Sequence, residues 1–287
     1  MIYNTPEQWQ GAPNKRVLLF GMSGLGKTHV SNLLRASGSW FHYSIDYRIG
    51  TRYMGEHIAD NFKREAMKIP LLRELLMTDS VRIASNITFD NLAPLSTYLG
   101  KPGNPARGGL PYDEYMKRQE QHRAAETAAL ADTAHFADRA LGLYGYANFI
   151  CDSGGSICEI VDPADPADPI LSRLADCVLM VWIKGSESHR AELVRRFDRS
   201  PKPMYYKTGF LTSCWSEYLS EFNVKSDEVD PDSFIRWTYA RALEHRQPRY
   251  AAMARNWGIS VTAGEVAQVA TADDFDALIC DALARRA

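Results

Sequence analysis

The sequence has little of what marks a secreted or membrane protein. Its 287 residues include five cysteines, and no two of them stand in a Cys-x-x-Cys pattern. We therefore expect reduced thiols rather than a disulfide framework or a zinc site. The segment Met1–Asn14 lacks the apolar stretch of a signal peptide, and no apolar run approaches the length that spans a bilayer. These absences predict a cytoplasmic protein without a membrane segment.

An excess of positive charge is also missing. The chain has 33 Lys and Arg against 35 Asp and Glu, which gives a net charge of −2. General nucleic-acid binding is not expected, because binding to a phosphate backbone usually requires a basic excess. The hydrophobic share of 45% and the charged share of 24% are typical of a globular protein. The length allows one large domain or two small ones.

Short apolar segments alternate along the chain with segments of helical spacing. The expected strands are 16–20, 40–45, 146–151, 177–183 and 259–262, with a weaker one at 81–87. The expected helices are 29–36, 61–77, 112–143 (as one helix or two), 231–257 and 272–286. Segment 112–143 has a thin apolar face, so we expect part of it to project into solvent. The alternation predicts an α/β fold with a parallel sheet, in which ligands bind at the carboxyl ends of the strands.

A glycine-rich motif directly follows the first strand. Residues 21–28 read Gly-Met-Ser-Gly-Leu-Gly-Lys-Thr and fit the Walker A pattern G-x-x-x-x-G-K-[ST] at every fixed position. Backbone N–H groups of such a loop face phosphates, the lysine reaches the β- and γ-phosphates, and the hydroxyl holds Mg²⁺. The motif predicts binding of ATP with Mg²⁺; ATP is preferred to GTP because no N-K-x-D guanine motif follows. The expected nucleotide contacts are Gly21, Ser23, Gly24, Leu25, Gly26, Lys27, Thr28 and His29.

Two acidic residues stand where strands end. Asp152 follows an apolar strand, as a Walker B acid does, and is predicted to hold Mg²⁺ opposite Thr28; the alternative is a turn-forming Asp. Asp46 follows the second strand and could accept a proton from an acceptor hydroxyl or hold Mg²⁺ through water; the alternative is a strand-end cap. Gly154 and Gly155 would let an acceptor approach the backbone, although a plain turn explains them nearly as well.

Basic residues follow the fourth strand. Arg196, Arg199 and Lys202 are predicted to lie in a lid at about 195–212 that closes over the triphosphate and stabilises the transferring charge. A solvated basic loop is the alternative for each of them. Arg246 is a candidate acceptor contact, and an exposed helix arginine is the alternative.

The form G-x-x-G-x-G-K-T resembles the shikimate kinase family of small-molecule P-loop kinases. Four later segments resemble motifs of that family in the same order: 44–50, 149–156, 179–204 with Arg195-Arg196 and Lys202-Pro203, and 246–254. The chain departs from the family at Ser44, where the family has Asp, and at Ser156, where it has a third glycine. About a hundred residues separate Asp46 from Asp152, roughly twice the family's spacing, so we expect an acceptor other than shikimate.

The resemblance implies a P-loop NTPase three-layer sandwich with a parallel sheet and a helical insertion. It places the first part of the core at 1–50, a mainly helical acceptor region at 51–145, and the second part of the core with the lid at 146–287. The predicted activity is an ATP-dependent phosphotransferase with Lys27, Asp46 and Arg196 as catalytic residues. The alternatives are a P-loop ATPase or nucleotide switch that regulates a protein partner, and a zeta-toxin-like kinase.

Overall fold

The computed structural model describes residues 1–286, and the chain divides into two compact units. The first unit comprises Met1–Ile45, Thr127–Pro201 and the described residues from Arg236 onward. The second unit comprises Asp46–Glu126 and Lys202–Ile235. Two long helices, α7 (Tyr112–Ala131) and α13 (Pro231–Trp257), contribute residues to both units.

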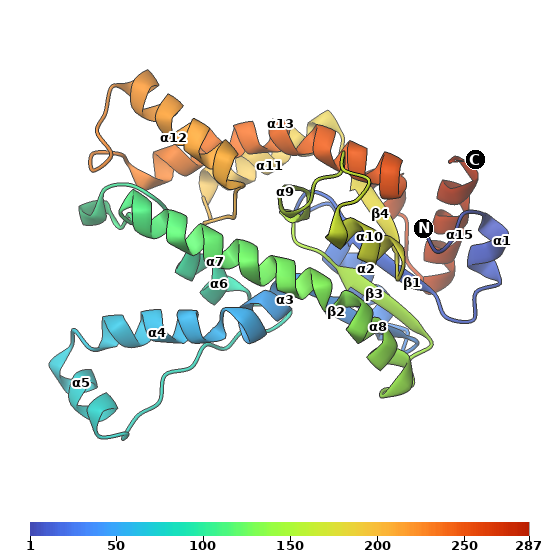
Figure 1. Cartoon of the computed structure of the whole chain (residues 1–287), viewed down its shortest axis with the longest axis horizontal. Coiled ribbons are helices and arrows are strands. Elements are labelled where there is room, and N and C mark those ends of the chain that lie inside the picture. The colour runs from blue at the N-terminus through green and yellow to red at the C-terminus, as the bar shows by residue number, and fades with distance from the viewer. Residues whose placement is uncertain (287) are drawn as a thin grey trace. The chain divides into compact units, whose positions relative to one another are not determined.

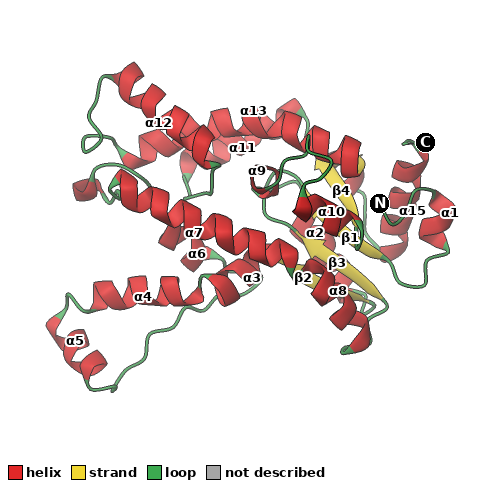
Figure 2. Ribbon diagram, in the orientation of Figure 1, coloured by secondary structure: helices red, strands yellow, loops and turns green. Residues whose placement is uncertain are grey.

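The first unit is built on a five-stranded sheet in which every pair of neighbours is parallel (Figure 2). The strands are β1 (Arg16–Phe20), β2 (Trp40–Ser44), β3 (Asn148–Asp152), β4 (Leu179–Lys184) and β5 (Gly258–Thr262). Their order across the sheet is β2-β3-β1-β4-β5, so β1 is central. The predicted α/β fold with a parallel sheet is confirmed, and each of the five main predicted strands is found within two residues of its expected bounds.

Helices flank this sheet, and the central strands are therefore buried on both faces. The helices of the first unit are α1 (Pro6–Gln10), α2 (Lys27–Ala36), α8 (Thr133–Gly142), α9 (Ile157–Ile160), α10 (Pro169–Ala175), α11 (Glu187–Arg199), α14 (Ala263–Val266) and α15 (Ala272–Ala284). Val17, Leu18 and Phe20 of β1 are completely buried, which explains the continuous apolar run in that strand. Near the two labelled ends of the chain, α1 and α15 lie side by side (Figure 1).

The second unit is helical. Its elements are α3 (Ile45–Arg48, of which Ile45 belongs to the first unit), the π-helix Ile49–Tyr53, α4 (Gly55–Ala66), α5 (Pro70–Met77), α6 (Ala93–Leu99), the 3₁₀-helix Pro105–Arg107 and α12 (Thr208–Phe222). Stacked aromatic rings join its parts: Tyr112 of α7 stacks on Trp215 of α12 at 4.6 Å, and Trp215 meets Phe234 edge to face at 4.8 Å. Such pairs add specific geometry to the burial of large apolar side chains.

One expectation from the sequence was wrong. Segment 81–87 forms no strand; it is a loop between α5 and α6, and no described strand lies beside it to accept its backbone hydrogen bonds. Segment 112–143 is exposed in part, with Leu143 at its end 61% exposed. It forms α7 and α8, and α7 buries polar side chains such as Gln119 and His122. The Gln119 amide donates to the carbonyl of Met204 and accepts from the N–H of Tyr206, which explains how a thin apolar face is buried.

Among residues 1–286, none of the helices combines the length and the apolar character that crossing a bilayer requires.

Candidate nucleotide-binding site

The glycine-rich loop lies at the carboxyl end of the central strand. β1 ends at Phe20, residues 21–26 form the turn, and α2 begins at Lys27. Gly24 and Gly26 have φ angles of +85° and +101°, in the left-handed region that L-residues rarely adopt. These angles turn the chain into the first turn of α2, whose free N–H groups favour an anion at that end. The local geometry is therefore that of a phosphate cradle.

Lys27 is held inside this turn. The residue is only 6% exposed, and its ammonium group donates hydrogen bonds to the carbonyls of Gly21 at 2.8 Å and Met22 at 2.9 Å. A buried ammonium held by loop carbonyls keeps a positive charge at the point where a Walker A lysine meets phosphate oxygens.

Thr28 and Asp152 meet beside the loop. The Thr28 hydroxyl donates to Oδ2 of Asp152 at 2.9 Å, which joins the start of α2 to the end of β3. Burial raises the pKa of Asp152, and this effect exceeds the opposing effects of the Lys27 charge and of the Thr28 hydrogen bond. The carboxylate is therefore costly to keep charged in this environment, and a second nearby cation would lower that cost.

The residues present fit a Mg²⁺ ion bound with a nucleotide. Mg²⁺ prefers hard oxygen ligands and usually takes one or two from the protein, with water and phosphate supplying the rest. Thr28 and Asp152 supply a hydroxyl and a carboxylate at 2.9 Å from each other. Within residues 1–286, no group of three or more His, Cys, Asp and Glu side chains forms a self-contained metal site. A protein-only metal cage is thus not found there.

His42 was not identified from the sequence. It lies on β2 with Nε2 4.0 Å from Oδ2 of Asp152, and burial lowers its pKa to about 4, with a smaller contribution from Arg35. The imidazole is therefore neutral at pH 7. Strand pairing brings it there, because β2 lies beside β3 with Ser44 opposite Asp152; no local motif marks the residue.

The three predicted lid residues, Arg196, Arg199 and Lys202, differ in their positions and in their contacts. Arg196 lies on α11, and a Cβ built on Gly24 would stand 3.7 Å from its Nη1, so this guanidinium reaches the loop. The Arg199 side chain is 74% exposed, and its Nε donates to the carbonyl of Arg195. Lys202 is exposed and belongs to the second unit. Of the three, the structure brings Arg196 to the glycine loop.

Gly155 lies close to the loop as well. A Cβ built on it would stand 3.1 Å from the Ser23 hydroxyl and 3.8 Å from Nη1 of Arg246. The Arg246 guanidinium is buried and forms two hydrogen bonds with Glu159, at 2.9 and 3.2 Å. Arg246 is therefore not the exposed helix residue of the alternative interpretation.

Glu159 and Tyr250 also lie beside this turn, and neither was assigned a role in the site from the sequence. Glu159 is on α9 and pairs with Arg246 of α13, and the Tyr250 hydroxyl donates to the carbonyl of Gly155. Together they attach the Gly154–Gly155 turn to α13. The partners are separated by 87 and 95 residues, so no short pattern in the sequence indicates them.

The remaining predicted residues are distributed as follows. Leu25 is buried against Gly185, whereas Ser23, Thr28 and His29 are exposed at the surface of the first unit. Asp46 is half-buried on α3 and belongs to the second unit.

Comparisons with known proteins add a distant likeness of fold. No protein-family model matches the chain, and no curated protein matches it. The crystal structure of shikimate kinase from Bacteroides thetaiotaomicron is similar to it over 94% of this chain and 95% of that chain, with 15% sequence identity and a TM-score of 0.38.

Proposed function

We propose that this chain is an ATP-binding, Mg²⁺-dependent phosphotransferase that acts on a soluble small-molecule acceptor. The observation that carries the proposal is the set of contacts around residues 21–28: Lys27 is held inside the glycine loop, Thr28 is hydrogen-bonded to Asp152, and Arg196 lies beside Gly24. Phosphoryl transfer depends mainly on positioning and on stabilising negative charge, and this set supplies both.

The reaction moves one phosphoryl group. The bond between the β–γ bridging oxygen and the γ-phosphorus breaks, the acceptor oxygen bonds to that phosphorus, and the acceptor proton passes to a base. Lys27 and Arg196 stabilise the negative charge on the transferring group and on the leaving ADP. Asp46 is the group that we assign to orient the acceptor hydroxyl or take its proton. When bound through Thr28 and Asp152, Mg²⁺ would neutralise charge on the phosphate oxygens.

We assign the acceptor contacts to the Gly154–Gly155 turn and Arg246. Glu159 and Arg246 are almost completely buried, so their double hydrogen bond fixes the guanidinium plane. The Nη1 atom near the Gly155 position is the part of that guanidinium best suited to face an anionic acceptor group. Rigid support of this kind favours correct positioning, which contributes to rate only when the geometry is held closely.

The decisive experiment uses γ-labelled ATP. The full chain is incubated with Mg²⁺, labelled ATP and a pooled extract of small metabolites, and the products are separated to find new labelled compounds. GTP is run in parallel, because the preference for ATP rests on the missing guanine motif. Lys27→Ala serves as the inactive variant, and Lys117→Ala, which changes an exposed lysine on α7, serves as the matched control.

A discrete labelled compound that appears with the wild type and with Lys117→Ala, but not with Lys27→Ala, supports the proposal and identifies the acceptor. Label that appears only as free phosphate, at a rate unchanged by the extract, would refute the small-molecule phosphotransferase. The activity would then be that of an ATPase or nucleotide switch.

A further inference from the structure

The helix α5 presents an apolar surface that the chain itself does not cover. Its sequence is Pro-Leu-Leu-Arg-Glu-Leu-Leu-Met, and none of its residues is buried. Leu71 is 65% exposed and Met77 is 73% exposed, and they are flanked by Ile69 at 51% and Val81 at 37%. These four are half of the eight large hydrophobic residues that are exposed among residues 1–286. A concentration of this kind marks an interaction surface, whereas single exposed apolar residues do not.

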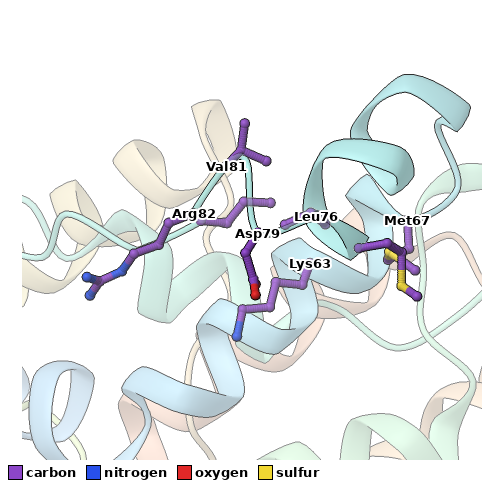
Figure 3. A pocket seen from close by; sticks show the side chains of 8 residues that line it. Lys63, Met67, Leu76, Asp79, Val81 and Arg82 are labelled. Atoms are coloured by element: carbon purple, nitrogen blue, oxygen red, sulfur yellow. The ribbon is translucent and has the colours of Figure 1, made fainter.

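A groove adjoins this surface. It has a volume of about 470 Å³ and lies among residues of α4, α5 and the segment after α5 (Figure 3). Its lining includes the apolar residues Met67, Met77 and Val81 and the charged residues Lys63, Asp79 and Arg82. Met77 and Val81 belong both to the groove and to the exposed surface. Because Ile69 and Leu71 lie outside the groove, a small ligand in it would leave much of the apolar surface in water. A partner with an extended surface would cover both parts.

The hairpin of α4 and α5 holds this surface in a defined shape. At the end of α5, the N–H of Ser80 donates to the carbonyl of Leu75 at 2.8 Å, and the N–H of Asp79 donates to that of Leu76 at 3.3 Å. Asp79 has a φ of +52°, so the helix closes with a Schellman turn. At its start, Nε of Arg73 donates to the carbonyl of Met67 at 2.8 Å. Both ends of α5 are fixed, and binding would require little ordering of the hairpin.

The charges beside the apolar surface are of both signs. Within residues 1–286, the side chains of Glu74, Asp79 and Arg82 form no hydrogen bond or ion pair. A surface with unpaired charges of both signs can complement a copy of itself, which a two-fold contact requires. The same mixture does not favour an anionic membrane or a nucleic acid, since those partners select surfaces with a basic excess.

We propose that a second copy of this chain binds here, so that the α4–α5 hairpins of two protomers pack together around a two-fold axis. Leu71 and Met77 of the two chains bury one another, and Arg82 of each protomer faces Glu74 or Asp79 of the other. The surface of one hairpin is smaller than the roughly 800 Å² per partner of a standard interface, so the dimer is expected to depend on concentration. This proposal does not depend on the proposed enzymatic function.

The test measures the mass of the full chain by sedimentation equilibrium, from about 1 to about 200 μM. The average mass of the wild type is expected to rise with concentration, from 32.3 kDa toward twice that mass. Leu71→Glu and Met77→Glu should remain monomeric throughout. Leu143→Glu is the matched control. Leu143 is 61% exposed and lies outside the α4–α5 hairpin, so this variant should dimerise like the wild type. Circular dichroism checks that each variant is folded.

A charge exchange tests the pairing itself. Arg82→Glu should raise the dissociation constant about 10-fold, and adding Glu74→Arg and Asp79→Lys should restore it. A wild type that stays monomeric would overturn the proposal, and so would a dimer unaffected by Leu71→Glu. If the monomer instead binds phosphatidylserine vesicles, or a different protein through the same residues, the second copy is the wrong partner.

Discussion

Replacement of Gly26 by alanine tests whether the glycine loop is the nucleotide site. Gly26 precedes α2 with a φ of +101°, and a Cβ on it would stand 3.0 Å from a methyl carbon of Val266. An L-residue in the left-handed region costs about 1–2 kcal/mol. The variant can relieve this strain only by moving the backbone of the loop, because Val266 restricts the space for the new methyl group.

The other end of the same helix supplies the control. Gly38 follows α2 with a φ of +81°, and a Cβ there would meet no atom within 4 Å. Gly38→Ala should therefore lose about 1–2 kcal/mol of stability from the same backbone effect. Gly26→Ala should lose at least as much. Only Gly26→Ala, however, moves N–H groups of the phosphate cradle, so its affinity for Mg²⁺–ATP should fall about 10- to 100-fold, or about 1.4–2.8 kcal/mol.

Urea unfolding gives the free energies of unfolding of both variants, and titration calorimetry gives their affinities for Mg²⁺–ATP. The informative quantity is the difference between the two variants, since each carries a similar backbone strain. If Gly26→Ala is destabilised like Gly38→Ala but binds Mg²⁺–ATP as tightly as the wild type, the phosphates do not rest on this loop. The site assignment would then be wrong.

Three further predictions concern the surroundings of the loop. Glu159→Gln leaves the buried charge of Arg246 without its carboxylate and should cost about 3–5 kcal/mol in urea unfolding, whereas a loss below about 1 kcal/mol would contradict a tightly coupled pair. Burial lowers the pKa of His42 from its ordinary 6.5 to about 4. Above pH 6.5 the residue is neutral whether the chain is folded or unfolded, but between pH 6.5 and 4 the unfolded chain binds the proton first. The titration of His42 should therefore lower the free energy of unfolding by about 2 kcal/mol between pH 7 and 5. If the free energy of unfolding of His42→Gln falls over this range as much as that of the wild type, the prediction is refuted. Removing Mg²⁺ with a chelator should lower the ATP affinity of the wild type far more than that of Asp152→Asn. If calorimetry shows the same loss of affinity for both proteins, Asp152 is not part of the metal site.

The sequence predicted the elements whose cause is local. The central strands β1, β3 and β4 are short, mainly apolar runs, because a strand buried on both faces needs apolar residues at nearly every position. The edge strands β2 and β5 include polar residues but also lie near their expected positions. The start of α11 has a local cause as well, since the Ser186 side chain caps the helix by accepting from the N–H of His189. Segment 81–87 failed the same kind of prediction: apolar residues permit a strand, but a neighbouring strand has to be present to pair with it.

The sequence by itself determined the glycine loop, since Gly24, Gly26, Lys27 and Thr28 are neighbours in the chain and their turn depends on their own backbone angles. Only the tertiary structure decided what surrounds that loop. Packing brings Arg196 to Gly24, and the pairing of Glu159 with Arg246 joins residues 87 positions apart. The exposure of α5 was decided in the same way, because its leucines would suit a core equally well. Contacts between distant segments depend on the packing of the whole fold, which a local pattern does not contain.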